Sequence, residues 1–330
     1  MGTVVAVVLG VGVAVQARIN GELGQRIDDG LVAALVSFLG GLVLLVTLAA
    51  ALPPMRVGLR RVATALGRRE LGRREPGDRE SGRRELRPYH LLGGVFGAFL
   101  VTCQGLTVAT IGVAVFTVAV VAGQVASGLL VDRAGVGPGG PQPVTAARIV
   151  GAILALAAVL LAVSDRLGAP QALWPAVLTA LAGAGVAWQQ AVNGRVGAAA
   201  RRDGHPLAGM LPAALVNFGV GTAALVLVTG VTVAIRGLPG ALPAQPWLYL
   251  GGPLGVLFIA AAAAIVAITG VLLLGLGTVA GQLVGALLLD LFWPVTDGRL
   301  AGTALAGTAL ALLAVTVIAL PIPRTGRHRG

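Results

Sequence analysis

Residues 93–132 read GGVFGAFLVTCQGLTVATIGVAVFTVAVVAGQVASGLLVD, and residues 251–290 read GGPLGVLFIAAAAAIVAITGVLLLGLGTVAGQLVGALLLD. The two stretches align without a gap and are identical at 14 of 40 positions. Apolar identities are expected by chance in such sequences, but Gln124 also coincides with Gln282, and Asp132 with Asp290. Because Gln and Asp are rare in membrane spans, these coincidences indicate an internal repeat.

A second pair of matching stretches lies earlier in each half of the chain. Residues 12–24 and 185–197 share the pattern Gly-x-x-x-Gln-x-x-x-Asn-Gly-x-x-Gly, and residues 36–38 (VSF) match residues 216–218 (VNF). Each half then holds five apolar spans, and an odd number of spans inserts the second copy in the opposite orientation. The sequence therefore predicts two inverted five-helix repeats, residues 1–164 and 165–330, as in many secondary transporters.

The composition is that of an integral membrane protein. Hydrophobic residues make up 56% of the chain and charged residues 11%, with a mean hydropathy of +0.91. A soluble domain usually carries about 25% charged residues, so this chain could not cover a water-facing surface. The fold class expected is all-α, with about ten spans of about 20 residues. We place them at 3–22, 31–52, 89–109, 112–131, 145–164, 172–193, 207–235, 247–267, 269–291 and 301–321.

The one long hydrophilic segment, residues 53–88, holds eleven Arg against five Asp or Glu. Such segments can bind RNA or anionic lipid, but we interpret this one as a cytoplasmic linker that obeys the positive-inside rule, with no nucleic-acid partner. Both termini are then cytoplasmic. Residues 1–17 could pass for a signal peptide, but they lack a basic start, so we interpret them as part of the first helix. The single cysteine, Cys103, excludes an internal disulfide.

Several of these motifs carry a family resemblance: Gln16-Ala-Arg-Ile-Asn20-Gly-Glu-Leu-Gly24, Val36-Ser-Phe38-Leu-Gly40, Gly123-Gln124 and Asp132-Arg-Ala-Gly135, with their counterparts in the second half. The chain resembles the YdcZ-like branch of the drug/metabolite transporter superfamily over nearly its whole length, except residues 53–88. The resemblance implies a bacterial inner-membrane protein with the ten-helix, EamA-like fold of that superfamily. Small multidrug-resistance relatives carry a membrane-embedded Glu in the first helix. This chain has Gln16 near that region and Glu22 only at the helix end, which argues against simple carboxylate-based proton coupling.

Amide side chains at matched positions are the candidate substrate-binding residues. Within each of the two stretches, 12–24 and 185–197, the Gly, Gln and Asn are spaced by four, so they share one helical face. The amides offer donors and acceptors for an uncharged or zwitterionic substrate, and the glycines let a helix or ligand approach. The alternative is a packing seam joined by amide hydrogen bonds. We expect one central cavity lined by Gln16, Asn20, Gln124, Gln189, Asn193 and Gln282.

The secondary candidates are polar residues at or near the same spans and in the spans that follow the first and sixth, namely Arg18, Ser37, Asn217, Asp132 and Asp290. Arg18 has Glu22 at i+4, so it is either a snorkelling residue in a local ion pair or a gate that attracts anions. The two aspartates lie at the ends of their spans. There we expect them to cap a helix or to pair with Arg133 or Arg299, rather than to couple transport to an ion. Ser37 and Asn217 are matched residues that suit either substrate contact or packing.

The function that these patterns favour is transport of a small molecule by alternating access around a midplane cavity. We find no catalytic motif, metal site or cofactor site, and the three histidines are assigned to loops or the tail. Three rivals are a lipid-carrier flippase, which a lateral opening between helices would favour, a membrane-embedded enzyme, which would need clustered carboxylates or histidines, and a scaffold. The expected partners are the bilayer and a small-molecule substrate, and the sequence is compatible with a monomer or a homodimer.

Overall fold

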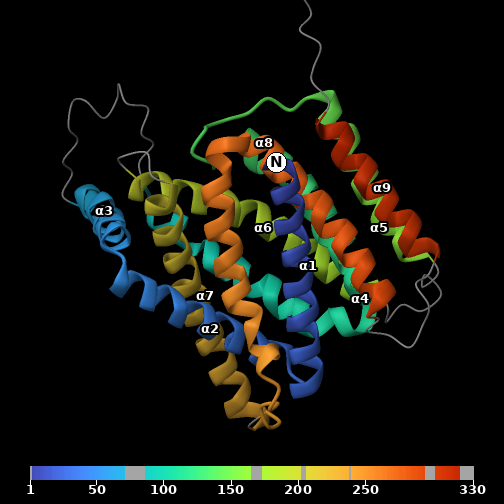
Figure 1. Ribbon diagram of the computed structural model, residues 1–330, viewed down its shortest axis with the longest axis horizontal. Helices are drawn as coiled ribbons and strands as arrows, with labels where there is room; N and C mark the ends of the chain where they lie inside the picture. Colours follow the sequence, from blue (N-terminus) through green and yellow to red (C-terminus); the bar gives the residue numbers. More distant parts are fainter. Residues whose placement is uncertain are drawn as a thin grey trace, which may run out of the picture.

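The computed structural model describes residues 2–70, 86–164, 173–201, 206–237, 239–293 and 302–319, and every regular element in these ranges is helical (Figure 1). The α-helices are α1 (Gly2–Ile27), α2 (Gly30–Ala51), α3 (Pro53–Glu70), α4 (Gly93–Arg133), α5 (Ala146–Ala162), α6 (Leu173–Ala200), α7 (Pro206–Arg236), α8 (Gly251–Phe292) and α9 (Gly302–Ala319). Short 3₁₀ helices, η2 (Pro88–Leu92) and η5 (Pro246–Leu250), lead directly into α4 and α8.

A tight turn joins α1 to α2. Asp28 takes a positive φ of 58°, a conformation that Asp tolerates better than most residues. The next residue, Asp29, caps α2 by accepting hydrogen bonds from the backbone N–H groups of Leu31 (2.8 Å) and Val32 (3.0 Å). These contacts satisfy N–H groups that have no partner within the helix. The chain therefore changes direction sharply between the first two spans.

Helix α4 is broken at Gly112, where the sequence predicts a boundary between two spans. Gly112 has φ 81° and ψ 163°, which a residue with a Cβ rarely adopts. Asp290, from the end of α8, accepts hydrogen bonds from the N–H groups of Val113 (2.9 Å) and Ala114 (2.7 Å). The second half of α4 thus begins like a separate helix, with its N-terminal N–H groups capped by a carboxylate from the other repeat.

Helix α8 occupies the matching place in the second half. The boundary expected between residues 267 and 269 lies within α8, which is assigned as helical from Gly251 to Phe292. Figure 1 shows the α8 ribbon bending over, so that its two arms run in opposite directions, as two separate spans would. The side chains of residues 259–276 lie outside the description.

Four helical stretches in the described residues are long and apolar enough to cross a membrane: Val4–Ile27, Gly30–Ala51, Pro88–Arg133 and Ala208–Arg236. Pro88–Arg133 is 46 residues long, about twice what one crossing needs, in keeping with its break at Gly112. Shorter apolar helices lie at Ala146–Ala162, Pro246–Phe258, Gly277–Phe292 and Gly302–Val317, and α6 also belongs to the bundle, where it packs along α4.

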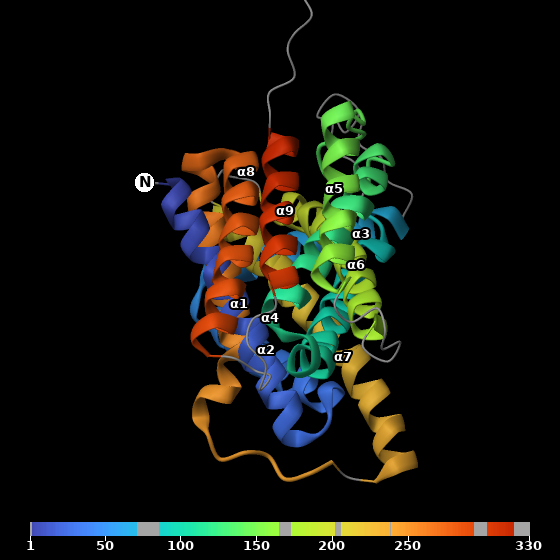
Figure 2. The same ribbon diagram turned by 90° about the vertical axis from the view of Figure 1, so that its right-hand side faces the viewer.

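The first helix of each repeat packs against the second arm of the long helix from the other repeat. α1 lies along α8, and α6 lies along α4. A Cβ at Gly10 would overlap the carbonyl oxygen of Thr278, and one at Gly183 would overlap that of Val120. Gly10 and Gly183 occupy equivalent positions of the two repeats. The two repeats therefore pack against each other through equivalent helix pairs. Helices α5 and α9 pack together at one side of the molecule (Figures 1 and 2).

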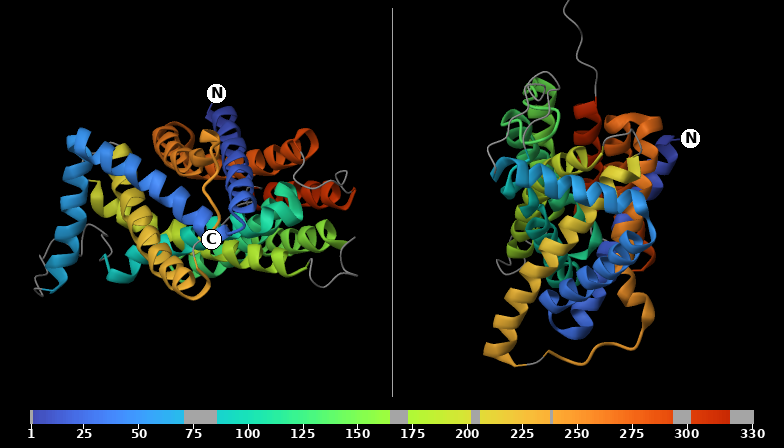
Figure 3. Two further views of the ribbon diagram at one scale, coloured as in Figure 1. Left: turned by 90° about the horizontal axis from the view of Figure 1, so that it is seen from below. Right: turned by 90° about the vertical axis from the view of Figure 1, so that its left-hand side faces the viewer.

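The first half of the linker expected at residues 53–88 contains a helix that the sequence analysis does not predict. Residues 53–70 form α3, which turns away from the end of α2 and packs on α6 and α7 (Figure 3). Met55 and Val62 are buried there, at 1% and 4% exposure. Their spacing of seven places both on one face of the helix. Residues 71–85 lie outside the described residues.

Candidate functional site

The amides of α6 form one polar cluster at the start of α4. Gln189 Nε2 donates to Asn217 Oδ1 (3.2 Å), and Asn217 Nδ2 donates to Asn193 Oδ1 (3.1 Å). Gly93 and Gly97 of α4 lie against these amides, since a Cβ on Gly97 would come within 2.5 Å of Gln189 Nε2. We call Gln189, Asn193 and Asn217 the second amide cluster. It joins the first two helices of the second repeat to the third span of the first repeat.

The equivalent residues Gln16, Asn20 and Ser37 form the first amide cluster, at the start of α8. Gln16 Nε2 donates to the carbonyl oxygen of Gly251 (2.8 Å). Asn20 is fully buried, and its Nδ2 donates to Gln104 Oε1 (2.7 Å) on α4. Asn20 Oδ1 is buried without a hydrogen-bond partner among the described residues. This cluster therefore joins helices of both repeats and leaves one buried acceptor unused.

Two phenylalanines whose rings contact each other at a tilt lie between the helices that carry the clusters. Phe38 follows Ser37 and Phe218 follows Asn217, and their ring centroids are 4.9 Å apart with the planes inclined by 34°. Phe38 packs on Gly221 of α7, and Phe218 packs on the equivalent Gly41 of α2. Because the two contacts mirror each other, this aromatic pair marks the pseudo-two-fold axis that relates the repeats.

Gln124 and Gln282 sit where the long helices cross α6 and α1. Gln124 Nε2 donates to Gln190 Oε1 (3.0 Å) in an exposed contact. Gln282 is half-buried, and its backbone nitrogen lies against Gly10. Within the described residues, the side-chain hydrogen bond of Gln124 reaches neither amide cluster, so these polar contacts form separate groups. Gln190 was not among the sequence candidates, although a second Gln beside Gln189 is itself a rare polar residue in a span.

The two aspartates have different partners. Asp290 caps the second half of α4, as described above, so the capping role expected for it is confirmed. Asp132 instead forms an ion pair with Arg148 of α5 (3.0 Å), so the pairing expected with Arg133 is wrong. Arg299 lies outside the described residues. The Asp132 carboxylate is 47% exposed, and a half-exposed ion pair of this kind contributes little to stability.

Arg18 belongs to a charged and aromatic group at the end of α1. It is 6% exposed, and its guanidinium pairs with Glu22 (2.8 Å), as the sequence predicts. Glu22 also pairs with Arg26 (2.7 Å). Arg18 lies 5.1 Å from the ring centroid of Trp293, at the end of α8. Arg18 is thus buried by contact with the other repeat rather than extended toward the bilayer surface.

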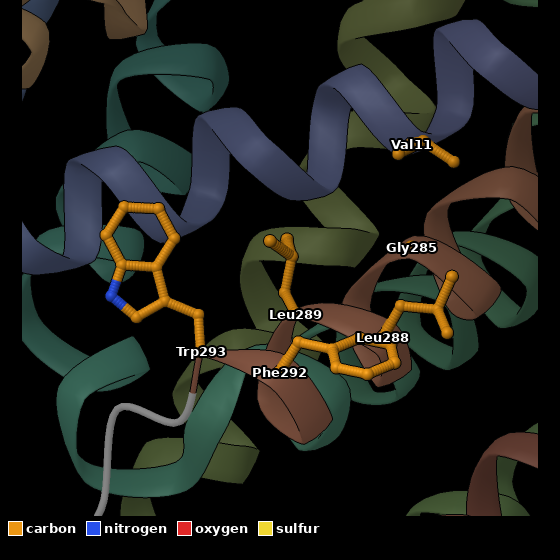
Figure 4. Close-up of a pocket in the computed structure, with 6 residues that line it drawn as sticks. All are labelled: Val11, Gly285, Leu288, Leu289, Phe292 and Trp293. Carbon is orange, nitrogen blue, oxygen red and sulfur yellow. The ribbon is translucent and has the colours of Figure 1, made fainter.

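A cavity of ≈ 330 Å³ opens between α1 and α8 beside this group. Figure 4 shows its lining side chains, with the Trp293 ring turned toward α1 and Val11 reaching it from α1. Its lining is Val11, Gly285, Leu288, Leu289, Phe292 and Trp293. Phe292 is 79% exposed, so the cavity lies at the surface of the bundle.

At the equivalent place in the other half, Arg195 connects α6 to the end of α4. Its Nη2 donates to the carbonyl oxygen of Gly135 (2.8 Å), and its Nε donates to that of Val136. In the repeat alignment, Arg195 matches Glu22, and Gly135 matches Trp293. The two ends of the molecule thus make the same helix-to-helix connection with different residues.

The histidine assigned to a loop, His90, is buried in η2, where its Nδ1 accepts from the backbone N–H of Arg87 (2.9 Å). The assignment to a loop is therefore wrong for this residue. In the described ranges, no three His, Cys, Asp or Glu residues come together in a way that could hold a metal ion.

Comparison with known proteins identifies one family. The family described as "Putative inner membrane exporter, YdcZ" matches residues 1–161 and residues 174–317. The two matched stretches correspond to the two repeats, and together they cover most of the chain. Among curated proteins, none matches the chain significantly.

Proposed function

The chain belongs to this family of inner membrane exporters, and from that premise we propose that it moves a small molecule across the bacterial inner membrane by alternating access. Its two five-helix repeats rock against each other around the Phe38–Phe218 pair. Transporters with inverted repeats commonly work in this way, because the same contacts at opposite ends of the molecule can open in turn.

The observation that carries the proposal is the pair of equivalent connections between the repeats. In each connection, the amides of one repeat pack against the glycine-rich start of a long helix of the other repeat. Such contacts let two rigid units pivot, since small residues allow close approach and polar contacts fix the position. In this proposal the amides exchange some of their hydrogen bonds between helices for hydrogen bonds to the substrate.

The two end connections are the gates of this mechanism. Arg18 on Trp293 holds α1 to the end of α8, and Arg195 on the carbonyl groups of residues 135 and 136 holds α6 to the end of α4. With both termini cytoplasmic, the Arg18 gate faces outward and the Arg195 gate faces the cytoplasm. Alternating access requires that one opens while the other closes.

Reporter fusions test the orientation. Fusions after residues 80, 202 and 325 should report a cytoplasmic location, and fusions after residues 28 and 240 an external one, because arginine-rich segments remain inside. An external location at residue 80 would reverse the two gates.

Purified protein screened by thermal shift against a metabolite library tests the function itself, since a ligand stabilises the state that it binds. Ligands that raise the melting temperature should then show counterflow in proteoliposomes. The Asn20→Leu variant should lose the ligand-induced shift, whereas Gly12→Ala, on the same helix with no atom near its Cβ, should keep it. Ligands that stabilise the protein but never cross the bilayer would contradict the proposal.

One observation favours a second candidate, the lipid-carrier flippase. The α1/α8 cavity is lined by apolar residues, lies at the surface of the bundle and includes Trp293, the ring that Arg18 contacts; an amphiphile with an anionic headgroup would suit such surroundings. The same screen discriminates, because a flippase would be stabilised by lipid-linked compounds and not by water-soluble metabolites.

A further inference from the structure

Helix α3 is a basic helix with one face packed on the protein and one face outward. Its sequence, PPMRVGLRRVATALGRRE, holds five arginines and one glutamate. Met55, Gly58 and Val62 face α6 and α7, where a Cβ on Gly58 would come within 2.7 Å of the Ala208 carbonyl oxygen. The inner face is thus fully occupied, and any partner must meet the outer face.

The outer face combines arginines with exposed apolar side chains. Arg56 and Arg60 are exposed, as are Val57 at 43% and, just before the helix, Leu52 at 38%. Arg56 donates one hydrogen bond to the Ala50 carbonyl oxygen (2.8 Å) at the end of α2, which fixes its guanidinium where that helix ends. A surface of this composition suits the boundary between lipid headgroups and acyl chains.

The placement of α3 agrees with such a boundary. α2 is strongly apolar, carries no charged residue and is long enough to cross the membrane, so we expect α3 to begin where the chain leaves the hydrocarbon. Figure 3 shows α3 turning sharply from α2 and running across the direction of the long helices. A helix lying in the membrane plane places its arginines beside phosphate groups, which guanidinium binds with two parallel hydrogen bonds.

We propose that the outer face of α3, through Arg56 and Arg60, is a binding surface for the headgroups of anionic phospholipids. The proposal concerns the bilayer and not the transported molecule, so it is independent of the transport mechanism. The buried inner face explains why the surface is preformed: the protein orders the helix, and binding need not fold it.

Native mass spectrometry of the full-length protein tests the proposal, with phosphatidylglycerol or phosphatidylcholine added. The wild type should bind phosphatidylglycerol preferentially. The double variant Arg56→Gln/Arg60→Gln should lose that preference on the order of tenfold, since each basic residue near an anionic surface contributes to attraction. Arg56→Lys/Arg60→Lys should restore most of it, because the charge remains.

The matched control is Arg133→Gln/Arg236→Gln, which removes two exposed arginines from the ends of α4 and α7 and leaves α3 intact. It should keep the wild-type preference. The proposal is overturned if the α3 variant still prefers phosphatidylglycerol, or if the control loses the preference equally. It is also overturned if single-stranded RNA displaces the lipid from the wild type but not from the α3 variant, because α3 would then be a nucleic-acid surface. Unchanged melting temperatures establish that all variants are folded.

Discussion

The two amide clusters occupy equivalent positions but form different hydrogen bonds. In the second cluster, Asn217 bonds both Gln189 and Asn193, so the three amides satisfy one another. In the first cluster, Ser37 stands in place of Asn217, and Gln16 and Asn20 bond outward, to Gly251 and Gln104. Gln104 has Ala262 as its counterpart, so this bond has no equivalent.

The difference separates what the fold requires from what each half adds. The glycine contacts are present in both clusters, so they belong to the shared scaffold. The hydrogen bonds differ between the clusters, so they are particular to each half and are not part of the shared scaffold. The second cluster resembles a completed packing contact, whereas the first contains a buried oxygen, Asn20 Oδ1, with no partner. An unused buried acceptor is costly unless something else meets it, so substrate contact is expected at the first cluster before the second.

The largest expected effect comes from the shared glycines. Gly252→Ala and Gly94→Ala each place a methyl group on a backbone carbonyl oxygen, that of Ser37 or Asn217. Overpacking of this kind costs about 1–3 kcal/mol or more, and both variants should show clearly lowered melting temperatures and yield of folded protein. Gly12→Ala and Gly219→Ala, where no atom lies within 4 Å, are the controls. If only one of Gly94 and Gly252 is sensitive, the clusters do not share one scaffold.

A smaller effect is expected when the second cluster is converted toward the first. Asn217→Ser removes two hydrogen bonds between helices, which contribute about 0.6 kcal/mol each in a membrane. The melting temperature should fall by a few degrees in a thermal unfolding experiment. The reciprocal change, Ser37→Asn, should not lower it, since it offers a donor near the unused Asn20 Oδ1. Equal destabilisation by both changes would show that volume, and not hydrogen bonding, distinguishes the clusters.

The smallest effect is expected at the glutamines outside the clusters. Gln124→Leu breaks an exposed contact with Gln190, so the free energy of unfolding should change by less than about 0.5 kcal/mol. Gln282→Leu should behave alike. Counterflow assays decide their role in transport: a loss of about tenfold at unchanged melting temperature, equivalent to about 1.4 kcal/mol, would place them in the substrate path. Wild-type transport in both variants would leave the amide clusters as the remaining candidates.

The repeats, the break at Gly112 and the Arg18–Glu22 pair could be predicted because each leaves a local or matched pattern in the sequence. The helix break needs a glycine, and an i, i+4 pair needs only helical spacing. The partners of Asn20 and Arg18 could not be predicted in the same way. Gln104 lies 84 residues from Asn20 and has no matched polar counterpart, and nothing local links Arg18 to Trp293.

Helix α3 was missed for a different physical reason. Its arginines make it less apolar, and its two glycines lower its helix propensity. Only Met55, Val62 and their neighbours indicate the buried face. The packing on α6 and α7 supplies the stabilisation that the local sequence does not. Tertiary contact, which a single sequence does not display, decides such elements.

The central claim, that the two ends open in turn, is tested most directly by electron–electron distance measurements between spin labels on symmetry-equivalent pairs. Gln25 with Leu291 reports on the Arg18 gate, and Ala198 with Arg133 reports on the Arg195 gate; all four are exposed, whereas Cys103 is buried. Arg18→Gln should lengthen the first distance and shorten the second, and Arg195→Gln should do the reverse. Distances that stay the same in both variants, or that change together in one direction, would contradict alternating access by rocking of the repeats.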